Sequence, residues 1–262
     1  MSSGASFDIV APMEQSSLYD RPDLYDLIAP PDPILERFYV EMAHERGARV
    51  LDLACGSGRL SIPLAKARLQ VVGGDLSSEM LQRARRSAET QSIELDLVQL
   101  DVGDFDLRGG AFDTIIVAMN SVLHLHSLED FRSFFRSAAR HLSQDSRLVF
   151  DAFMPNFAML SCDPNERQFV GRAIHDTLGI VTVEETVKYD PVAQISHADW
   201  YWSTEAKKDF LRRPLQMRVI FPQEMPLLIA SGGLRFVERF GDFHRSQLET
   251  GSRRQVCMCT PA

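Results

Sequence analysis

The sequence predicts an α/β protein whose core is a doubly wound, mostly parallel, seven-stranded sheet, with an N-terminal helical cap and an antiparallel β insertion. Two observations predict this fold class. From about residue 49 to 153, short apolar runs alternate with helical patterns, and such alternation requires parallel strands joined by right-handed crossovers. From about residue 167 to 219 the apolar residues recur with period two instead, which is typical of antiparallel strands.

Residues 1–45 are expected to form the helical cap. The first sixteen or so residues are polar, show no periodicity and are expected to be frayed. Two short helices are expected after them, interrupted by the prolines of Pro30-Pro31-Asp32-Pro33. The second of these helices is expected over residues 34–44.

Residues 46–166 are expected to form the core. The run Thr114–Met119 is almost continuously apolar, as in a strand buried on both faces. Ser77 is a suitable N-cap for the helix that follows the second strand, with Glu79 in its first turn. The strands are expected at 50–53, 71–75, 95–101, 114–119 and 147–153, and the helices between them at 58–67, 77–89 and 128–142.

The remaining residues divide into two parts. Residues 167–219 are expected to form the antiparallel insertion, with turn signals at Leu178-Gly179 and Tyr189-Asp190-Pro191. Residues 220–262 are expected to return to the core as a helix over 222–231, which ends at Gly232-Gly233, and a strand pair at 234–240 and 255–260.

Composition narrows the possible partners. The 262 residues carry a net charge of −8, which argues against binding to a nucleic-acid backbone, since that needs a Lys/Arg field. No apolar run is long enough to span a membrane, and the N-terminus does not resemble a signal peptide. The four cysteines show no disulfide framework, and no metal site is predicted. We expect a cytoplasmic protein.

The stretch RVLDLACGSGRL (residues 49–60) combines a strand, a glycine turn and the start of a helix. A helix N-terminus preceded by glycines offers free N–H groups and lets the backbone approach a ligand closely. Asp75 follows Gly56 by nineteen positions, at the end of the next strand, where a carboxylate can accept hydrogen bonds from the two hydroxyls of a ribose. A nucleoside-containing ligand is therefore predicted.

Two ligand classes compete for this turn. Nicotinamide-dependent oxidoreductases continue the glycine pattern with a third small residue that packs under a pyrophosphate, whereas here Ser61, Ile62 and Pro63 follow. Asp52, just before the turn, would repel a pyrophosphate but would favour a cationic ligand. The residues favour S-adenosylmethionine over NAD.

Four ordered segments carry a family resemblance. VLDLACGSG, VVGGDLSSEML, LVQLDVGDFDL and FDTIIVAMNSVLHL resemble the first four motifs of class I S-adenosylmethionine-dependent methyltransferases, at the family's spacing. The resemblance covers residues 49 to about 125 and implies a Rossmann-like core. It implies that Asp75 binds the ribose, that Met80, Asp101 and Val102 contact the adenine, and that the fourth segment passes the methyl group. The implied cofactor-binding residues are Asp52, Ala54, Cys55, Gly56, Ser57, Gly58, Asp75, Leu76, Met80, Asp101, Val102, Met119 and Asn120.

The chain is similar, more faintly, to bacterial amino-sugar N,N-dimethyltransferases. The similar segments are Leu24-Tyr-Asp-Leu-Ile28, Asn120-Ser-Val-Leu-His-Leu125 and Phe153-Met-Pro-Asn156. In that subgroup a tyrosine matching Tyr25 lies near the cofactor and a histidine matching His124 lies in the acceptor pocket, which makes both candidates for catalysis. The stretch WYWSTEAKKDF of the insertion does not match the subgroup, so the amino-sugar substrate does not carry over.

Four further residues are candidate acceptor contacts. Tyr19 can close over the methionine end of the cofactor, or pack inside the cap. Trp200 and Trp202 lie two apart on an expected strand, where they form either an aromatic wall for the acceptor or the core of the insertion. His244 lies in the loop between the last two strands, which is expected to open on the ligand side.

The sequence thus predicts an S-adenosylmethionine-dependent methyltransferase that acts on a small molecule, with an amine favoured as the acceptor. Methyl transfer is an in-line displacement that requires mainly alignment of the two reactants and exclusion of water. The alternatives are O- or C-methylation of a small metabolite, or a subunit that binds S-adenosylmethionine without catalysis. Neither a nucleic acid nor a membrane is an expected partner, and either a monomer or a homodimer is expected.

Overall fold

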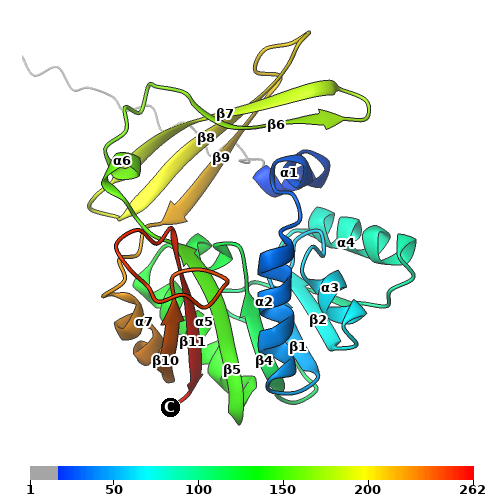
Figure 1. Cartoon of the computed structure of the whole chain (residues 1–262), viewed down its shortest axis with the longest axis vertical. Coiled ribbons are helices and arrows are strands. Elements are labelled where there is room, and N and C mark those ends of the chain that lie inside the picture. The colour runs from blue at the N-terminus through cyan, green and yellow to red at the C-terminus, as the bar shows by residue number, and fades with distance from the viewer. Residues whose placement is uncertain (1–16) are drawn as a thin grey trace, which may run out of the picture.

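The structure, a computed structural model, describes residues 17–262, so the frayed segment expected over residues 1–16 lies outside the described part. Two sheets make up the described chain: a seven-stranded sheet flanked by helices and a four-stranded sheet above it (Figure 1). Within residues 17–262, no helix combines the length and apolarity that a membrane span requires.

The large sheet confirms the predicted fold class. Six of its strands run in the same direction, and β11, which lies between β5 and the edge strand β10, runs antiparallel to both of them. The order across the sheet reverses at β1 and β4, which creates the crevice where open α/β sheets bind ligands. In that order the strands are β10 (Leu234–Phe240), β11 (Arg254–Pro261), β5 (Leu142–Phe153), β4 (Phe112–Val117), β1 (Arg49–Leu53), β2 (Gln70–Asp75) and β3 (Asp96–Gln99).

Helices cover both faces of this sheet. The helix α5 begins at a capping box, in which Ser127 and Asp130 bond each other's backbone N–H groups, and its phenylalanines form one apolar stripe. That stripe packs with α7 against one face of the sheet, whereas α2 and α3 pack against the other. The core helices are α2 (Pro33–His44), α3 (Ser61–Lys66), α4 (Ser78–Thr90), α5 (Leu128–Arg140) and α7 (Met225–Ser231).

The largest shift in an element boundary is at β5. This strand begins at Leu142, five residues before the expected start, because Leu142 already pairs with Phe112. The intervening Ser143-Gln-Asp145 is exposed and polar, which reads as a turn in the sequence. The β4–β5 register shifts between the Phe112–Leu142 and Thr114–Arg147 pairs, so this polar stretch is an irregularity within the strand and not a turn before it.

The four-stranded sheet lies over the carboxyl ends of the parallel strands (Figure 1). Its strands fall within the expected insertion at 167–219, and α6 (Phe157–Leu160) precedes them; the boundaries of the four chain ranges stay a prediction. The cap elements η1 (Leu18–Asp20) and α1 (Pro22–Ile28) pack beneath this sheet in a small apolar core. The strands, each antiparallel to the next, are β6 (Gln168–His175), β7 (Gly179–Asp190), β8 (Ile195–Thr204) and β9 (Leu211–Arg218).

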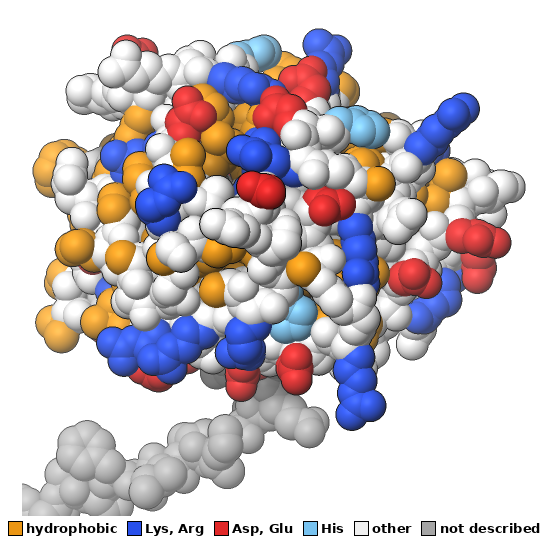
Figure 2. All heavy atoms as spheres, turned by 90° about the horizontal axis from the view of Figure 1, so that it is seen from below, with side chains coloured by type: hydrophobic (Ala, Val, Ile, Leu, Met, Phe, Trp, Pro, Cys, Tyr) orange, Lys and Arg blue, Asp and Glu red, His pale blue; other side chains and the backbone are white. Residues whose placement is uncertain are grey.

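The opposite end of the molecule presents a mixed surface. On the face shown in Figure 2, acidic and basic side chains are interspersed and do not gather by sign.

Candidate active site

A cavity of about 1130 Å³ lies between the carboxyl edge of the large sheet and the β6–β9 sheet. This volume is at the upper end of typical ligand sites and leaves room for a cofactor together with a second small molecule. The predicted site residues that line it are Tyr19, Tyr25, Ala54, Cys55, Gly56, Ser57, Asp75, Leu76, Met80, Asp101, Val102, Met119, Asn120, His124 and Trp200. Segments far apart in the sequence therefore meet at one cavity.

The glycine turn follows β1 and has the backbone that its sequence predicts. Gly56 and Gly58 have φ values of 56° and 83°, in the left-handed region that glycine adopts without strain. A Cβ atom at Gly58 would also lie 3.2 Å from the side chain of Ala84 in α4. Gly58 thus allows the turn and α4 to approach closely, but it does not line the cavity.

Asp75 closes the turn from the end of β2. Its Oδ2 accepts a hydrogen bond from the N–H of Gly56 at 2.8 Å, and its Oδ1 accepts one from the N–H of Ser77 at 2.9 Å. Burial raises the pKa of the Asp75 carboxyl above its usual value. A partly buried carboxylate of this kind is stabilised by further donors, which ribose hydroxyls would supply.

Beyond Asp75, the end of the cavity is more exposed to solvent than the glycine turn. Leu76 and Met80 line it from the β2–α4 connection, and Val102 lines it from the loop after β3. The exposed Asp101 accepts a hydrogen bond from the N–H of Gly103 at 2.8 Å. These residues form a mostly apolar slot with a carboxylate at its rim, which suits an adenine ring and its amino group.

The charge of the cavity favours a cationic ligand. Among the residues 17–262 that line it, Arg59 is the one arginine, and there is no lysine. A pyrophosphate would meet repulsion from the surrounding carboxylates, whereas a sulfonium and an ammonium group would be attracted. The acidic lining residues are Asp20, Asp75, Glu79, Asp101, Asp104, Glu129 and Asp130.

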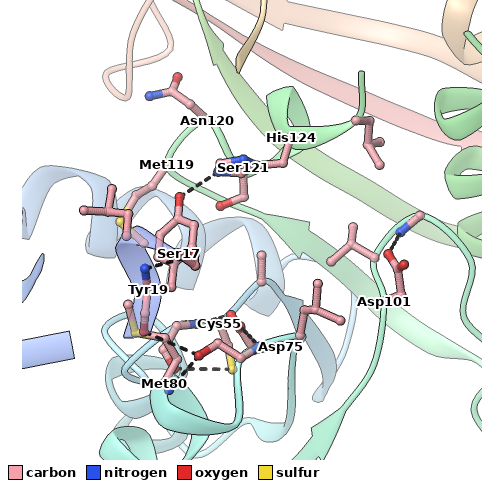
Figure 3. A pocket seen from close by; sticks show the side chains of 18 of the residues that line it. Ser17, Tyr19, Cys55, Asp75, Met80, Asp101, Met119, Asn120, Ser121 and His124 are labelled. Atoms are coloured by element: carbon pink, nitrogen blue, oxygen red, sulfur yellow. Dashed lines mark hydrogen bonds between the residues drawn. The ribbon is translucent and has the colours of Figure 1, made fainter. Parts of the chain in front are cut away.

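Tyr19 and His124 meet at the other end of the cavity. The phenol oxygen of Tyr19 lies 2.7 Å from Nε2 of His124, and Figure 3 shows the two side chains pointing toward one another. The ring of Tyr25 packs edge-on against Tyr19 with centroids 5.3 Å apart. Burial, and secondarily the charge of His126, lowers the pKa of His124 to about 4. The imidazole is therefore neutral at neutral pH, and its Nε2 can accept a hydrogen bond from the Tyr19 hydroxyl.

The two tryptophans of β8 differ in their surroundings. Trp200 lines the cavity together with Leu215 and Met217 of β9, and its indole N–H donates to Glu185 at 2.7 Å. Trp202 is only 1% exposed and packs in the apolar core between the cap and the β6–β9 sheet. Of the two interpretations left open by the sequence, the aromatic wall therefore fits Trp200 and the insertion core fits Trp202.

Two other predicted contacts do not reach the cavity. Asp52 is buried behind the turn, where its Oδ2 accepts a hydrogen bond from Ser61 Oγ at 2.5 Å. The expectation that the loop carrying His244 opens on the ligand side is wrong. Phe243 packs against α2, and Arg245 bonds Glu45 at the end of α2, so the loop folds back over the sheet.

No sequence pattern predicts the contacts that hold the cap over the glycine turn. Asp26 in α1 accepts a hydrogen bond from Ser57 Oγ at 2.7 Å, and its other oxygen lies 3.2 Å from Nε of Arg83 in α4. These three residues are far apart in the chain, and each is a common polar surface residue by itself. Tertiary structure alone brings them together.

Comparisons with known proteins agree with this site. Residues 50–145 match a family model described as a methyltransferase domain. Over 113 residues, the chain is 34% identical to the putative methyltransferase YqeM of Bacillus subtilis; the match covers 43% of this chain and 45% of that protein. The chain thus aligns with less than half of the length of this curated relative.

Solved structures match over nearly the whole chain. The CcbJ methyltransferase of Streptomyces caelestis superposes with a TM-score of 0.80 at 26% identity, over 94% of this chain and 98% of that one. The S-adenosylmethionine-bound structure of CalS10, an amino pentose methyltransferase from Micromonospora echinaspora, has a TM-score of 0.66 at 17% identity, over 88% and 92% of the two chains. At that identity the second likeness shows the fold.

Residues 50–145 therefore carry a methyltransferase domain, and the fold and the cavity agree with the resemblance to class I S-adenosylmethionine-dependent methyltransferases. The predicted enzyme class and cofactor agree with the matched methyltransferase domain and with the likeness to CcbJ.

Proposed function

We propose that the protein transfers a methyl group from S-adenosylmethionine to the nitrogen of a small-molecule amine. The observation that carries this proposal is the Tyr19–His124 pair at the end of the cavity opposite the adenine slot. The proposed acceptor lies against this pair, and the proposed cofactor contacts come from the glycine turn, Asp75, Leu76, Met80, Asp101 and Val102.

The lowered pKa of His124 supports an amine over a hydroxyl or an acidic carbon. General-base catalysis is most effective when the pKa of the base lies near the working pH, and His124 titrates at about 4. Such a histidine is a weak base that can still orient a donor. A neutral amine already has a free lone pair and needs only to be oriented, whereas a hydroxyl needs to lose its proton to a stronger base.

S-adenosylmethionine, when bound, supplies a methyl group activated by the positive sulfonium. The protein's own residues would hold, orient and shield the reactants. Asp75 would accept hydrogen bonds from the ribose hydroxyls, and Tyr25 and Trp200 would limit the acceptor end with aromatic rings. The hydrogen bond from Tyr19 would fix the imidazole of His124, so that both side chains present fixed polar atoms to the amine.

The enclosure of the site supports a small acceptor. The β6–β9 sheet and the cap lie over the carboxyl edge of the large sheet, so a reactant would be surrounded on most sides and water largely excluded (Figure 1). An amino pentose methyltransferase shares the fold, which is compatible with an amine of the size of an amino sugar.

The test is a transfer reaction with ¹³C-methyl-labelled S-adenosylmethionine and a panel of small amines, with the matching alcohols as controls. Primary and secondary amino sugars, alkyl amines and cyclic amines form the amine panel. The proposal expects a new ¹³C signal in the chemical-shift range of N-methyl groups, and none from an alcohol that lacks nitrogen. Labelling at oxygen or carbon would refute N-methylation. If no compound is labelled although S-adenosylhomocysteine binds, a non-catalytic binding subunit would be favoured.

A further inference from the structure

Asp151 is a buried carboxylate that does not line the cavity. It lies near the end of β5, fully shielded from solvent, between the apolar Phe150 and Ala152. Taking a carboxylate out of water is costly unless hydrogen bonds and charge compensate for the lost hydration. Its partners therefore indicate what the charge at this position is for.

The partners of Asp151 come from three different elements. Its Oδ1 accepts hydrogen bonds from the phenol of Tyr39 in α2 and from the N–H of Met119, both at 2.7 Å. Its Oδ2 lies 3.3 Å from the N–H of Asn120 and 3.5 Å from Nη1 of Arg254 in β11. The two short bonds thus reach α2 and the turn after β4, and the guanidinium is the more distant partner.

The turn that Asp151 holds has an unfavourable backbone. Met119 and Asn120 have φ values of 58° and 63°, and two consecutive non-glycine residues in the left-handed region are strained. This conformation persists only where the surroundings stabilise it. The N–H groups of both residues point at the Asp151 carboxylate. Two successive backbone N–H groups make a favourable site for an anion, so the carboxylate stabilises the turn.

The same turn sets the position of the acceptor end. It leads directly into η2 (Ser121–His124), so the direction of this short helix, and of the His124 side chain, depends on the turn. Met119 and Asn120 also line both the main cavity and an adjoining cavity of about 410 Å³ beneath α1.

We propose that Asp151 is a positioning residue for methyl transfer: its carboxylate holds the Met119–Asn120 turn in the conformation that directs His124 toward Tyr19 and shapes the acceptor end of the cavity. This inference rests on the proposed function for its effect on catalysis. The structural part, a carboxylate that fixes the turn, is independent of the acceptor.

The first arm of the test needs no acceptor. The chain contains three asparagines, Asn120, Asn156 and Asn165, so selective ¹⁵N-asparagine labelling reduces the backbone amide spectrum to three signals. The Asn120→Ser substitution assigns one of them. In the wild-type protein bound to S-adenosylhomocysteine, we expect the Asn120 amide to exchange slowest of the three with solvent. Asp151→Asn adds a fourth signal from the introduced asparagine, and we expect it to shift the Asn120 signal while the Asn156 and Asn165 signals stay in place.

Tyr39→Phe is the matched control, because it removes one hydrogen bond from the same carboxylate and leaves both backbone N–H groups of the turn in place. We expect this variant to leave the Asn120 signal close to its wild-type position. An Asn120 amide that exchanges as fast as the exposed Asn165 amide in the wild-type protein would overturn the proposal, even if Asp151→Asn fails to fold. An unshifted Asn120 signal in a folded Asp151→Asn variant would also overturn it.

The second arm measures transfer to an amine found by the labelling screen. We expect Asp151→Asn to lower kcat at least about tenfold while the Kd for S-adenosylhomocysteine changes less than about threefold, and Asp151→Glu to recover part of the loss. Equal losses of kcat in Asp151→Asn and Tyr39→Phe would show a merely structural role and overturn the proposal. If no amine is methylated, the proposed function fails, and the amide signals still decide whether Asp151 holds the turn.

Discussion

The phenol oxygen of Tyr19 lies 2.7 Å from Nε2 of His124, although the two residues are 105 positions apart in the chain. Tyr19 belongs to the cap, and His124 belongs to the short helix after β4. Their contact closes the acceptor end of the cavity, because it joins the cap to the short helix that follows β4. Burial raises the pKa of Tyr19 and lowers that of His124, so both side chains are neutral over the physiological range.

The first prediction concerns this pair. We expect His124→Ala and Tyr19→Phe each to raise the KM for the amine by about tenfold, since a lost hydrogen bond of about 1–1.5 kcal/mol corresponds to roughly that factor. Because the pKa of His124 is about 4, the wild-type kcat profile between about pH 6 and pH 8 should contain no step that His124→Ala removes. Steady-state kinetics across this range checks both points. A limb with a pKa near 6.5 that disappears in His124→Ala would show that His124 is a general base instead.

The second prediction concerns Asp75. Asp75→Ala removes the acceptor of two backbone hydrogen bonds and of the expected ribose bonds, and should weaken S-adenosylhomocysteine binding by about 2–3 kcal/mol. Calorimetry measures this loss as a rise in Kd of roughly 30- to 150-fold. Asp96→Asn, at the exposed start of β3, is the control and should leave the Kd unchanged. Equal affinities for the Asp75→Ala variant and the wild type would contradict the assignment of this carboxylate to the cofactor.

The third prediction follows from Asp52. Burial raises the pKa of Asp52 to about 7, despite the opposing hydrogen bond from Ser61, whereas in an unfolded chain an aspartate titrates near about 3.9. The folded protein therefore keeps a proton that the unfolded chain loses. This bound proton stabilises the folded state relative to the unfolded chain. The stabilisation is complete below the unfolded pKa and is lost as the pH rises toward about 7, by about 4 kcal/mol in total.

Urea unfolding at about pH 5, 6, 7 and 8 tests this dependence against the isosteric variant Asp52→Asn. The free energy of unfolding of the wild type should fall relative to that of the variant up to about pH 7 and then level off. A difference that stays constant over this range would show that the carboxyl is not protonated in the folded protein.

The fourth prediction separates the two tryptophans of β8. Trp202→Ala should lower the free energy of unfolding by about 3–5 kcal/mol, because it leaves a cavity in the core between the cap and the β6–β9 sheet. Trp200→Ala should destabilise less and instead raise the KM for the amine, since this ring lines the cavity. Chemical unfolding and steady-state kinetics on both variants provide the comparison, and the reverse pattern would refute the assignment of Trp200 to the acceptor wall.

Local sequence patterns predicted most of the residues that line the part of the cavity proposed for the cofactor. The glycine turn and Asp75 are each recognisable because a short stretch fixes their backbone, and parallel strands then bring them to the same edge. The roles of Tyr19, Asp26 and Asp151 depend on contacts between layers, which no periodicity records. The loop carrying His244 was misplaced for the same reason: the apolar contact of Phe243 with α2 outweighs the direction in which β10 ends.

A crystal structure of the protein with S-adenosylhomocysteine tests the central claim most directly. The account predicts that the ribose hydroxyls lie within hydrogen-bond distance of Asp75, that the adenine lies between Met80 and Val102, and that the sulfur faces Tyr19 and His124. Density for the ligand with its ribose away from Asp75, or with its sulfur directed away from the Tyr19–His124 pair, would contradict the account.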